Sequence, residues 1–445
     1  MKRRVVVAAA WYGSVLLWAF GTEPVRPHGP SPAAPAEPVT LEAVARANGC
    51  LDEGAAEAAA WPDWDSPGML GGDVPPARVV SDPYPTFHSV AVDAEHNRVV
   101  MTDSNRMGVL TYQRTAASAG NAVTKPLTHV RGPATAMMFV AGVAIDRERQ
   151  EIYTVDNDIG DRMLVFPYDA TGNARPKRVL HVPHQAWGLS LNKARDEVAV
   201  TVEGSNLIVI FRREASGEEQ PVRLIRGGRT GLGDPHGVFF DGVNDELVVA
   251  NHGNRSSRQW EGEAPVRARE GGEAAGNARQ EPGAAGERLV GGRFEPPSIT
   301  VFAGTAKGNT APLRTIQGPK TQLDWPMGVD VDTAHDEIAV ANNGDSSVLV
   351  FSRTAAGDVA PVRVLRGART GIDQPMGVAI DVANDELWVP NYNDHTALVF
   401  PRTASGNVAP RRIIRNAPAG APTGGFGNPG AVAYDTKRGE ILVPN

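Results

Sequence analysis

The sequence predicts an all-β fold built from repeated four-stranded units, and two observations lead to this prediction. The first is a repeat: Pro326 begins the stretch P-M-G-V-D-V-D-T-A-H-D-E-I-A-V-A-N, and Pro375 begins P-M-G-V-A-I-D-V-A-N-D-E-L-W-V-P-N. The second is the spacing of the repeat, because the equivalent residues Gly328 and Gly377 lie 49 residues apart. Self-similarity at this spacing, with several short strands in each unit, is the signature of a β-propeller.

The unit that begins at Gly377 shows why four strands are expected in each repeat. Apolar residues alternate with small or polar ones up to Asp381, which is the period of a strand. Three further apolar segments follow, separated by turn-forming residues such as Gly406 and Asn407. The expected second, third and fourth strands are residues 387–389, 397–400 and 411–414. One such unit cannot bury both of its faces alone, so the units are expected to pack around a ring.

Seven equivalent units can be traced, so the sequence predicts a propeller of seven blades. One spacing is longer than the others because residues 255–297 interrupt the fourth unit after Asn251. This segment is rich in Arg, Glu, Gly and Ala and has little periodicity, so we expect a disordered insertion. The seven units begin near Ser89, Gly142, Gly188, Gly237, Gly328, Gly377 and Gly430.

The seventh unit contains only two expected strands before Asn445. Its missing part is expected near the N-terminus, because residues 72–80 (G-D-V-P-P-A-R-V-V) match residues 357–365 (G-D-V-A-P-V-R-V-L). The predicted ring is therefore closed by N- and C-terminal strands that share the last blade, which removes exposed sheet edges. The propeller is expected to span residues 76–445.

The N-terminal segment has the features of an export signal. Residues 2–4 (K-R-R) are basic, residues 5–20 are mostly apolar, and Ala19-Phe20-Gly21 has the pattern of a cleavage site. We expect residues 1–21 to be a signal peptide and the protein to be secreted or periplasmic. A membrane is an expected partner only if this segment stays uncleaved. Residues 22–75 are expected to form a linker rich in Pro and Ala, with a composition compatible with one short helix.

The composition indicates how large a core the chain can form and which partners and covalent links it disfavours. The chain has 445 residues, 41% of them hydrophobic, which is enough for a large core. Its formal net charge is −7, whereas a nucleic-acid-binding protein normally presents a basic face, so no nucleic acid is expected among its partners. Cys50 is the only cysteine, so no disulfide can form within the chain.

These repeats resemble the NHL type of β-propeller. The resemblance rests on the motifs G-V-x-x-D, E-[LI]-x-V-x-N and V-[FI]-x-R, and it covers Pro76 to Asn445. It implies the architecture, and it is unspecific for activity. Members of the family include non-catalytic interaction scaffolds, and related propellers include lyases and lactonases with sites at the mouth of the central channel.

One column of polar residues ends the second strand of most units. Carboxylate and amide oxygens that converge on a channel would suit Ca²⁺, and histidines nearby would suit Zn²⁺. The alternative, which repetition in nearly every blade favours, is that these side chains cap turns through hydrogen bonds. No other cofactor is indicated. The candidate metal ligands are Asp103, Asp156, Asn251, Asn342 and Asn391.

A second column directly precedes the repeated glycine and is expected near the channel mouth. This column varies between blades, and a site on a pseudo-symmetric ring must break the symmetry. His88 and His236 are the candidate catalytic residues, as general bases or metal ligands; the alternative is that they are ordinary polar residues of surface loops. Trp187, Met327 and Met376 are the candidate lining of an apolar ligand pocket, with ordinary packing as the alternative.

A third column places an arginine on the outer strand of most units. Such a column would bind an anionic surface, or each arginine would pair with the acidic turn of a nearby hairpin, which is the interpretation that we prefer. The column consists of Arg78, Arg178, Arg223, Arg314, Arg363 and Arg411.

Two functions from different classes follow from these observations. The first is an exported, non-enzymatic, NHL-like β-propeller that acts as a binding scaffold for a protein, glycan or small-molecule ligand on one face. The sequence favours it, because no catalytic constellation is recognisable. The alternative is a metal-assisted lyase or lactone hydrolase at the channel mouth, with His88 and His236 as ligands or bases. Tightly bound divalent metal would separate the two.

Overall fold

The structure, a computed structural model, describes residues 82–157, 159–255, 258–260, 287–289, 293–421, 433–435 and 440–442. The chain divides into two compact units. One consists of residues 61–277 and 287–427 and contains the propeller; the other consists of residues 1–60, 278–286 and 428–445. The expected signal peptide and linker, residues 1–21 and 22–75, lie outside the described residues.

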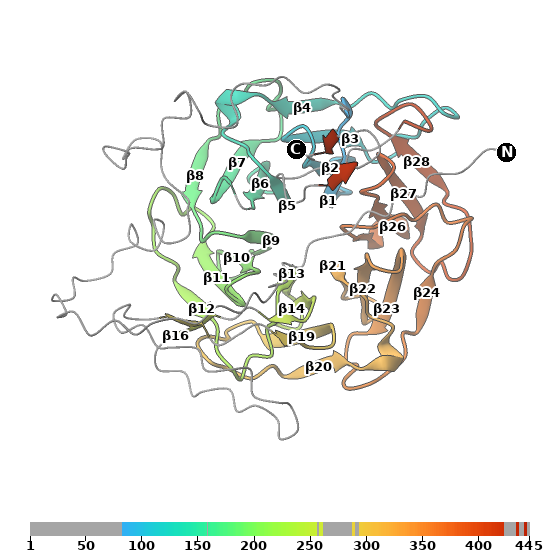
Figure 1. Ribbon diagram of the computed structural model, residues 1–445. Helices are drawn as coiled ribbons and strands as arrows, with labels where there is room; N and C mark the ends of the chain where they lie inside the picture. Colours follow the sequence, from blue (N-terminus) through green and yellow to red (C-terminus); the bar gives the residue numbers. More distant parts are fainter. Residues whose placement is uncertain are drawn as a thin grey trace. The chain divides into compact units, whose positions relative to one another are not determined.

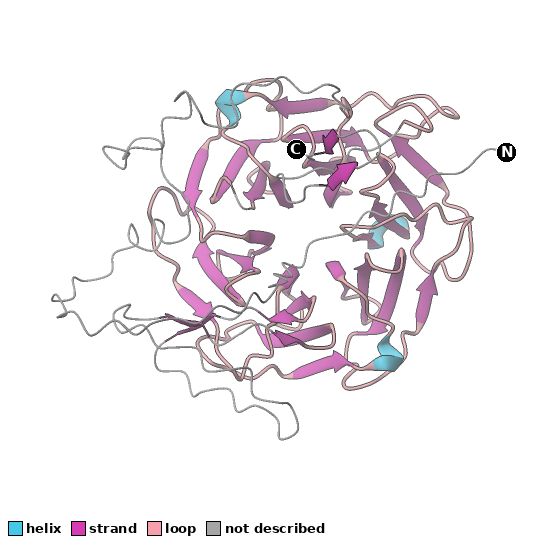
Figure 2. Cartoon of the chain, viewed as in Figure 1, coloured by secondary structure: helices cyan, strands magenta, loops and turns pink. Residues whose placement is uncertain are grey.

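The propeller consists of six antiparallel sheets, each with four strands in chain order, among the residues that the structure describes (Figures 1 and 2). Blade 1 contains β1 (Phe87–Asp93), β2 (Arg98–Asp103), β3 (Gly108–Gln113) and β4 (Thr128–Arg131). Blade 2 contains β5 (Val140–Asp146), β6 (Glu151–Asp156), β7 (Arg162–Pro167) and β8 (Arg178–His181). Blade 3 contains β9 (Ala186–Asn192), β10 (Glu197–Val202), β11 (Leu207–Arg212) and β12 (Arg223–Ile225).

The second half of the ring repeats this arrangement. Blade 4 contains β13 (Pro235–Asp241), β14 (Glu246–Asn251), β19 (Ser298–Ala303) and β20 (Arg314–Gln317). Blade 5 contains β21 (Pro326–Asp332), β22 (Glu337–Asn342), β23 (Ser347–Ser352) and β24 (Arg363–Leu365). Blade 6 contains β25 (Ala379–Asp381), β26 (Glu386–Pro390), β27 (Thr396–Pro401) and β28 (Arg412–Arg415). Three 3-10 helices, η1 (Pro133–Thr135), η2 (Pro319–Thr321) and η3 (Val382–Asn384), occur in connections, and no helix of the described residues is long and apolar enough to cross a membrane.

The core lies between neighbouring blades, because each sheet buries both of its faces. Val301 and Ile316 of blade 4, for example, pack in one cluster with Ile338 and Leu349 of blade 5. This is why the strands are apolar along most of their length rather than on alternate residues only. The repeat therefore encodes packing against two neighbours, as a ring requires.

The prediction of seven blades is wrong, because the sixth blade packs directly against the first. Phe87 and Tyr112 of blade 1 share a buried cluster with Trp388 and Ile414 of blade 6. The turn after β3 also donates from the Ser118 N–H to the Ile413 carbonyl, 2.8 Å away. Each of the six repeats supplies all four of its own strands, so the ring closes without a shared blade.

The expected seventh unit forms a separate hairpin. Its two strands, β29 (Ala433–Asp435) and β30 (Glu440–Leu442), pair with each other and with no other strand of the described residues, and they belong to the other compact unit. The N-terminal strand that was expected to complete this blade, residues 72–80, lies outside the described residues. The hairpin of β29 and β30 therefore carries the repeat motif without forming a blade of this ring.

The insertion lies between β14 and β19 of blade 4, and these two strands still pair with each other. β14 pairs with β19 in continuous register from Glu246↔Ala303 to Asn251↔Ser298. The two ends of the insertion also pair: β15 (Asn254–Arg255) with β18 (Arg293–Phe294), and β16 (Arg258–Trp260) with β17 (Glu287–Leu289). Between these strands, residues 261–286 lie outside the described residues.

The outer-strand arginines bind glutamates at the start of the second strand in their own blades. Arg178 lies 2.7 Å from Glu151, and Arg363 lies 2.5 Å from Glu337. In blade 6 the buried pair is shifted by one residue: Arg412 pairs with Glu386 at 2.5 Å, whereas the half-exposed Arg411 lies 4.0 Å from Asp385 of the same acidic turn. The prediction of acidic partners is confirmed for these blades, and Arg78 lies outside the described residues.

Candidate functional site

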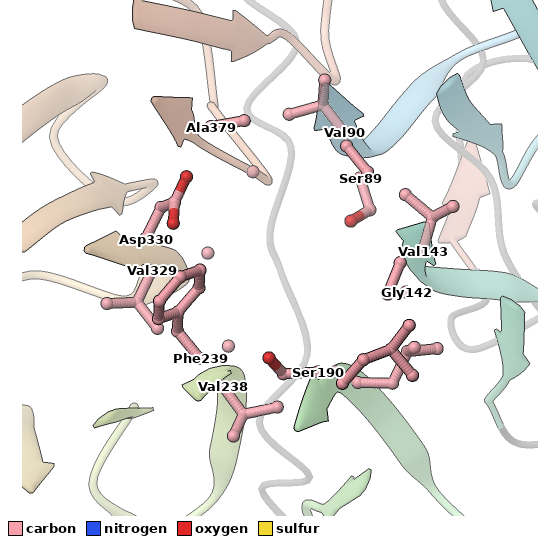
Figure 3. Close-up of a pocket in the computed structure, with 18 of the residues that line it drawn as sticks. Ser89, Val90, Gly142, Val143, Ser190, Val238, Phe239, Val329, Asp330 and Ala379 are labelled. Carbon is pink, nitrogen blue, oxygen red and sulfur yellow. The ribbon is translucent and has the colours of Figure 1, made fainter. Parts of the chain in front are cut away.

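The inner strands of the six blades enclose a central channel of about 570 Å³. Figure 3 shows Ser89, Gly142, Ser190 and Asp330 around it, contributed by β1, β5, β9 and β21. Most of its wall consists of valine, alanine and leucine side chains or glycine backbone. A volume of this size, with few polar groups in an apolar wall, is typical of a site for a small ligand.

The repeated glycine is explained by the narrowness of the ring. A Cβ atom on Gly328 would lie 2.7 Å from the Cα of Gly377, on the inner strand of the next blade, and 3.0 Å from the Val378 nitrogen. Both contacts are with backbone, which cannot move aside as a flexible side chain does. The inner strands therefore approach closely here, and the residue before each glycine lies at the constriction.

One end of the channel is lined by four of the predicted site residues. His88, Trp187, Met327 and Met376 all line the channel, and the two methionines are buried. The ring of His88 lies 5.0 Å from the ring of Trp187, and both methionines pack with Trp187 and Tyr392 in one cluster. The structure thus brings together residues from four different blades into an apolar, aromatic surface.

His88 is the unusual member of this surface. Its side chain is buried and packs against the rings of Phe139, Trp187 and Tyr392, at 5.7, 5.0 and 6.0 Å. Neither ring nitrogen has a hydrogen-bond partner among the described residues. Burial, and then the nearby charge of His236, lower the pKa of His88 to about 3. His88 is therefore a neutral imidazole with an unused donor and an unused acceptor.

The structure does not bring His236 to the same site. Trp187 packs against both histidines, with its ring 4.5 Å from that of His236, but His236 does not line the channel. Burial alone lowers the pKa of His236, but the carboxylates of Asp234 and Glu203 outweigh it and raise the pKa. Glu203 lies 3.0 Å from the Nε2 atom of His236. Burial thus favours the neutral form of His88, whereas nearby carboxylates favour the protonated form of His236.

The channel wall contains polar residues that sequence reasoning missed. Ser190 and Asp330 occupy the same position in their blades, two residues after the repeated glycine, and both link their blade to the next. Ser190 accepts from the Phe240 N–H at 2.9 Å, and Asp330 accepts from the Ile380 N–H at 2.7 Å. Burial raises the pKa of Asp330 to about 7. The sequence feature that could have identified these two residues is the variation at their position, which is alanine in three other blades.

Two cations lie at the other end of the inner strands. Arg147 and Lys193 line the channel, and their side chains are 45% and 40% exposed. Arg147 also donates to the carbonyl of Val92 at 2.9 Å, which holds its position. Each cation also has a carboxylate partner, with Arg147 3.6 Å from Asp93 and Lys193 3.7 Å from Glu148. The channel therefore runs from a neutral histidine at the buried end to an opening flanked by two ion-paired cations.

The predicted metal column caps turns in its own blades. Each member accepts a hydrogen bond from a backbone N–H in the loop that enters its blade: Asp324 N–H to Asn342 at 2.7 Å, and Asp373 N–H to Asn391 at 3.1 Å, for example. The equivalent bonds to Asp103, Asp156 and Asn251 measure 2.9, 3.2 and 3.2 Å. These are the bonds that the turn-capping interpretation predicts, and Ca²⁺ or Zn²⁺ binding by the column stays a prediction.

Comparison with known proteins adds only a general likeness. No family model and no curated protein matches the chain. Similar solved structures include hydrazine synthase of Kuenenia stuttgartiensis (12% identity, TM-score 0.47, covering 82% of this chain and 97% of that chain). A functionally unknown protein of Desulfotomaculum acetoxidans (14%, 0.46, 80% and 88%) and the WD40 β-propeller domain of Doa1 (12%, 0.44, 82% and 90%) are further examples. At these values the likenesses carry no argument about function.

Proposed function

We propose that this chain is an exported, non-enzymatic, NHL-like β-propeller that binds a small ligand in its central channel. The observation that carries the proposal is His88, whose two ring nitrogens are buried and unpaired at the end of the channel. An unsatisfied buried polar group costs about 1–3 kcal/mol. A ligand that offers a hydrogen-bonding group at this end would recover that cost.

The rest of the channel defines the class of ligand. The apolar wall suits a body of hydrocarbon or aromatic rings, and Trp187 and Met376 offer aromatic and thioether contacts at the buried end. Arg147 and Lys193 at the opening, although each also lies near one carboxylate, are the cations that a negatively charged group would meet. The proposed ligand is therefore a small amphiphilic anion, with its charged end toward the opening.

Binding is preferred over metal-assisted lyase or lactonase chemistry because of the placement of the two histidines. The enzyme alternative used His88 and His236 together, but only His88 lines the channel, and Trp187 packs against both imidazoles at 5.0 and 4.5 Å. Export is part of the proposal because residues 2–20 combine a basic start with an apolar run. The motifs of the repeats support the NHL-like assignment.

The test uses the full chain and the fluorescent probe 1-anilinonaphthalene-8-sulfonate, which joins aromatic rings to a sulfonate. We expect saturable binding of one probe per chain. Ala144→Phe, which copies the size of Phe239 from another blade into the channel wall, should weaken binding at least tenfold. His88→Leu, which removes the hydrogen-bonding nitrogens, should weaken it by up to about tenfold.

The matched control is Val222→Phe, which introduces the same phenyl ring at a side chain that is 52% exposed outside the channel. Its affinity for the probe should equal that of the unmodified chain. An affinity unchanged by Ala144→Phe, with the variant folded by circular dichroism, would place the probe elsewhere and overturn the proposal. Failure to observe saturable binding would do the same.

A further inference from the structure

Blade 4 brings together two histidines and an aspartate that the channel does not use. Asp234 precedes β13, His236 is its second residue, and His252 directly follows β14. Because β13 and β14 are antiparallel and Pro235 pairs with Asn251, the three residues meet at the same end of the sheet. Their side chains are 15%, 4% and 4% exposed. They form the one group of three or more metal-ligating side chains found among the described residues.

The geometry of this group suits a metal ion. The two imidazole rings are stacked, with centroids 3.5 Å apart and planes 17° apart. Both Nδ1 atoms face the same carboxylate: that of His236 lies 3.7 Å from one oxygen of Asp234, and that of His252 lies 3.6 Å from the other. Ligands at about 2.0–2.1 Å from a tetrahedral Zn²⁺ lie roughly 3.3 Å from one another. The ligating atoms of the three residues all lie within 4.8 Å of one another, and the stacked rings must turn so that the in-plane lone pairs of both Nδ1 atoms point at one ion.

The remaining ring nitrogens have partners of the kind that orient metal ligands. Nε2 of His236 lies 3.0 Å from Glu203, and Glu203 in turn accepts from Asn157 at 3.1 Å. Nε2 of His252 lies 2.8 Å from the sulfur of Met327. A carboxylate on the far nitrogen of a ligating histidine fixes the ring and increases its basicity. Both Nδ1 atoms are thereby turned toward Asp234. Nδ1 of His236 also lies 3.0 Å from the backbone carbonyl oxygen of Asp234, a hydrogen bond that a metal ion would replace.

The other blades show that the backbone alone does not require these side chains. Asp234, Trp325 and Gln374 occupy equivalent positions and share a left-handed backbone, with φ of 56°, 49° and 47°. His252 is equivalent to Asn343, which lies directly after β22, and to Tyr392, the second residue after β26. Only blade 4 combines Asp, His and His at these places. The combination breaks the symmetry of the ring, as a specific site must.

We propose that Asp234, His236 and His252 bind one divalent first-row transition-metal ion, with Zn²⁺ as its best candidate. Nδ1 of each histidine and one oxygen of Asp234 are the ligands, and water completes the tetrahedron. The group does not line the channel, so the ion fastens the loop before β13 to the end of β14 and takes no part in ligand binding. The site is distinct from the column predicted from the sequence, and it does not depend on the proposed function.

The test is a calorimetric titration of the full chain, stripped with a chelator, with Zn²⁺, followed by absorption spectroscopy with Co²⁺. We expect one tight site per chain and the visible absorption of tetrahedral Co²⁺. His252→Asn and His236→Met copy the residues of blade 5, Asn343 and Met327, so they should fold and should weaken Zn²⁺ affinity at least about 100-fold. Glu203→Gln keeps the ligands and should weaken it about 10–100-fold.

The matched control is His335→Ala, which removes a surface histidine whose Nδ1 lies 2.7 Å from Asp332. Its Zn²⁺ affinity should equal that of the unmodified chain. Absence of a tight site in the unmodified chain would overturn the proposal. So would a tight site that survives in the His236→Met, His252→Asn double variant, since the ion would then be held by other histidines or by Cys50.

Discussion

The guanidinium of Arg114 lies 2.9 Å from the carboxylate of Glu386, and this ion pair joins the first blade to the sixth. Arg114 directly follows the third strand of its blade. The same pair occurs where Arg353 meets Glu246 at 2.9 Å and where Arg402 meets Glu337 at 3.2 Å, each time with the preceding blade. The contact between blades 6 and 1, which closes the ring, therefore contains the same kind of ion pair as the contacts between blades 4 and 5 and between blades 5 and 6.

Removal of Arg114 should destabilise the whole propeller. The two side chains are only 12% and 7% exposed, so Arg114→Ala leaves the charge of Glu386 buried with Arg412 as its remaining partner. Breaking a buried ion pair costs about 3–5 kcal/mol. Because Arg412 still compensates the charge of Glu386, we expect a loss below that range, about 1–3 kcal/mol, in the free energy of unfolding measured with urea. Arg212→Ala, which removes an exposed partner of Glu219, is the control and should leave the urea midpoint unchanged.

Asp156 should make the protein less stable as the pH rises. Burial raises its pKa to about 7, from an ordinary value of 3.8, so the folded state holds a proton that the unfolded state has lost. This contribution is fully present below pH 4 and disappears as the pH rises through 7; three pKa units correspond to at most about 4 kcal/mol. Other groups also titrate, so the prediction concerns the difference from Asp156→Asn.

Asp156→Asn should stabilise the protein at pH 8 and have a smaller effect at pH 5. The variant copies Asn342 and Asn391, whose amides donate to the carbonyls of Gln322 and Gly371, whereas one oxygen of Asp156 is buried without a partner among the described residues. Thermal melting at both pH values measures the effect. Equal shifts at pH 5 and pH 8 would contradict the assignment of this pH dependence to Asp156.

Gly328→Ala should lower stability through a clash with the next blade. The new methyl group would meet backbone atoms at 2.7 and 3.0 Å, and overpacking of this kind costs about 1–3 kcal/mol. Gly242→Ala is the matched control, because its φ is not positive and no described atom lies within 4 Å of the position that the new methyl group would take. Denaturant unfolding should show a loss for the first variant and none for the second.

Binding of the anionic probe should weaken between pH 6 and pH 8 because of Asp330. Its carboxyl group lies in the channel wall, and its pKa of about 7 is set first by burial, with Asp332 raising it and Arg147 lowering it. The group is mostly neutral at pH 6 and repels an anion once it ionises. Asp330→Asn should remove the change in affinity, measured by fluorescence titration. A pH dependence retained in this variant would assign it to another group.

The sequence alone determined the four-stranded repeat and its apolar faces, because strand period and turn residues are local properties. It also identified the variable residues before the repeated glycine, five of which line the channel. It overestimated the number of blades, since the hairpin of β29 and β30 carries the local motif of a blade. Whether such a hairpin joins the ring depends on long-range packing, and Trp388 packs against blade 1 instead.

Only the tertiary structure decided which candidate side chains meet. His236 shares its surroundings with His252, sixteen residues further along, because adjacent antiparallel strands end together; nothing in the repeat pattern separated it from His88. Asp330 and Ser190 were missed because alternation along an inner strand does not say which side chains face the channel. Repetition thus encodes the blades, whereas the site arises from residues that differ between blades, and their neighbours are set by the closure of the ring.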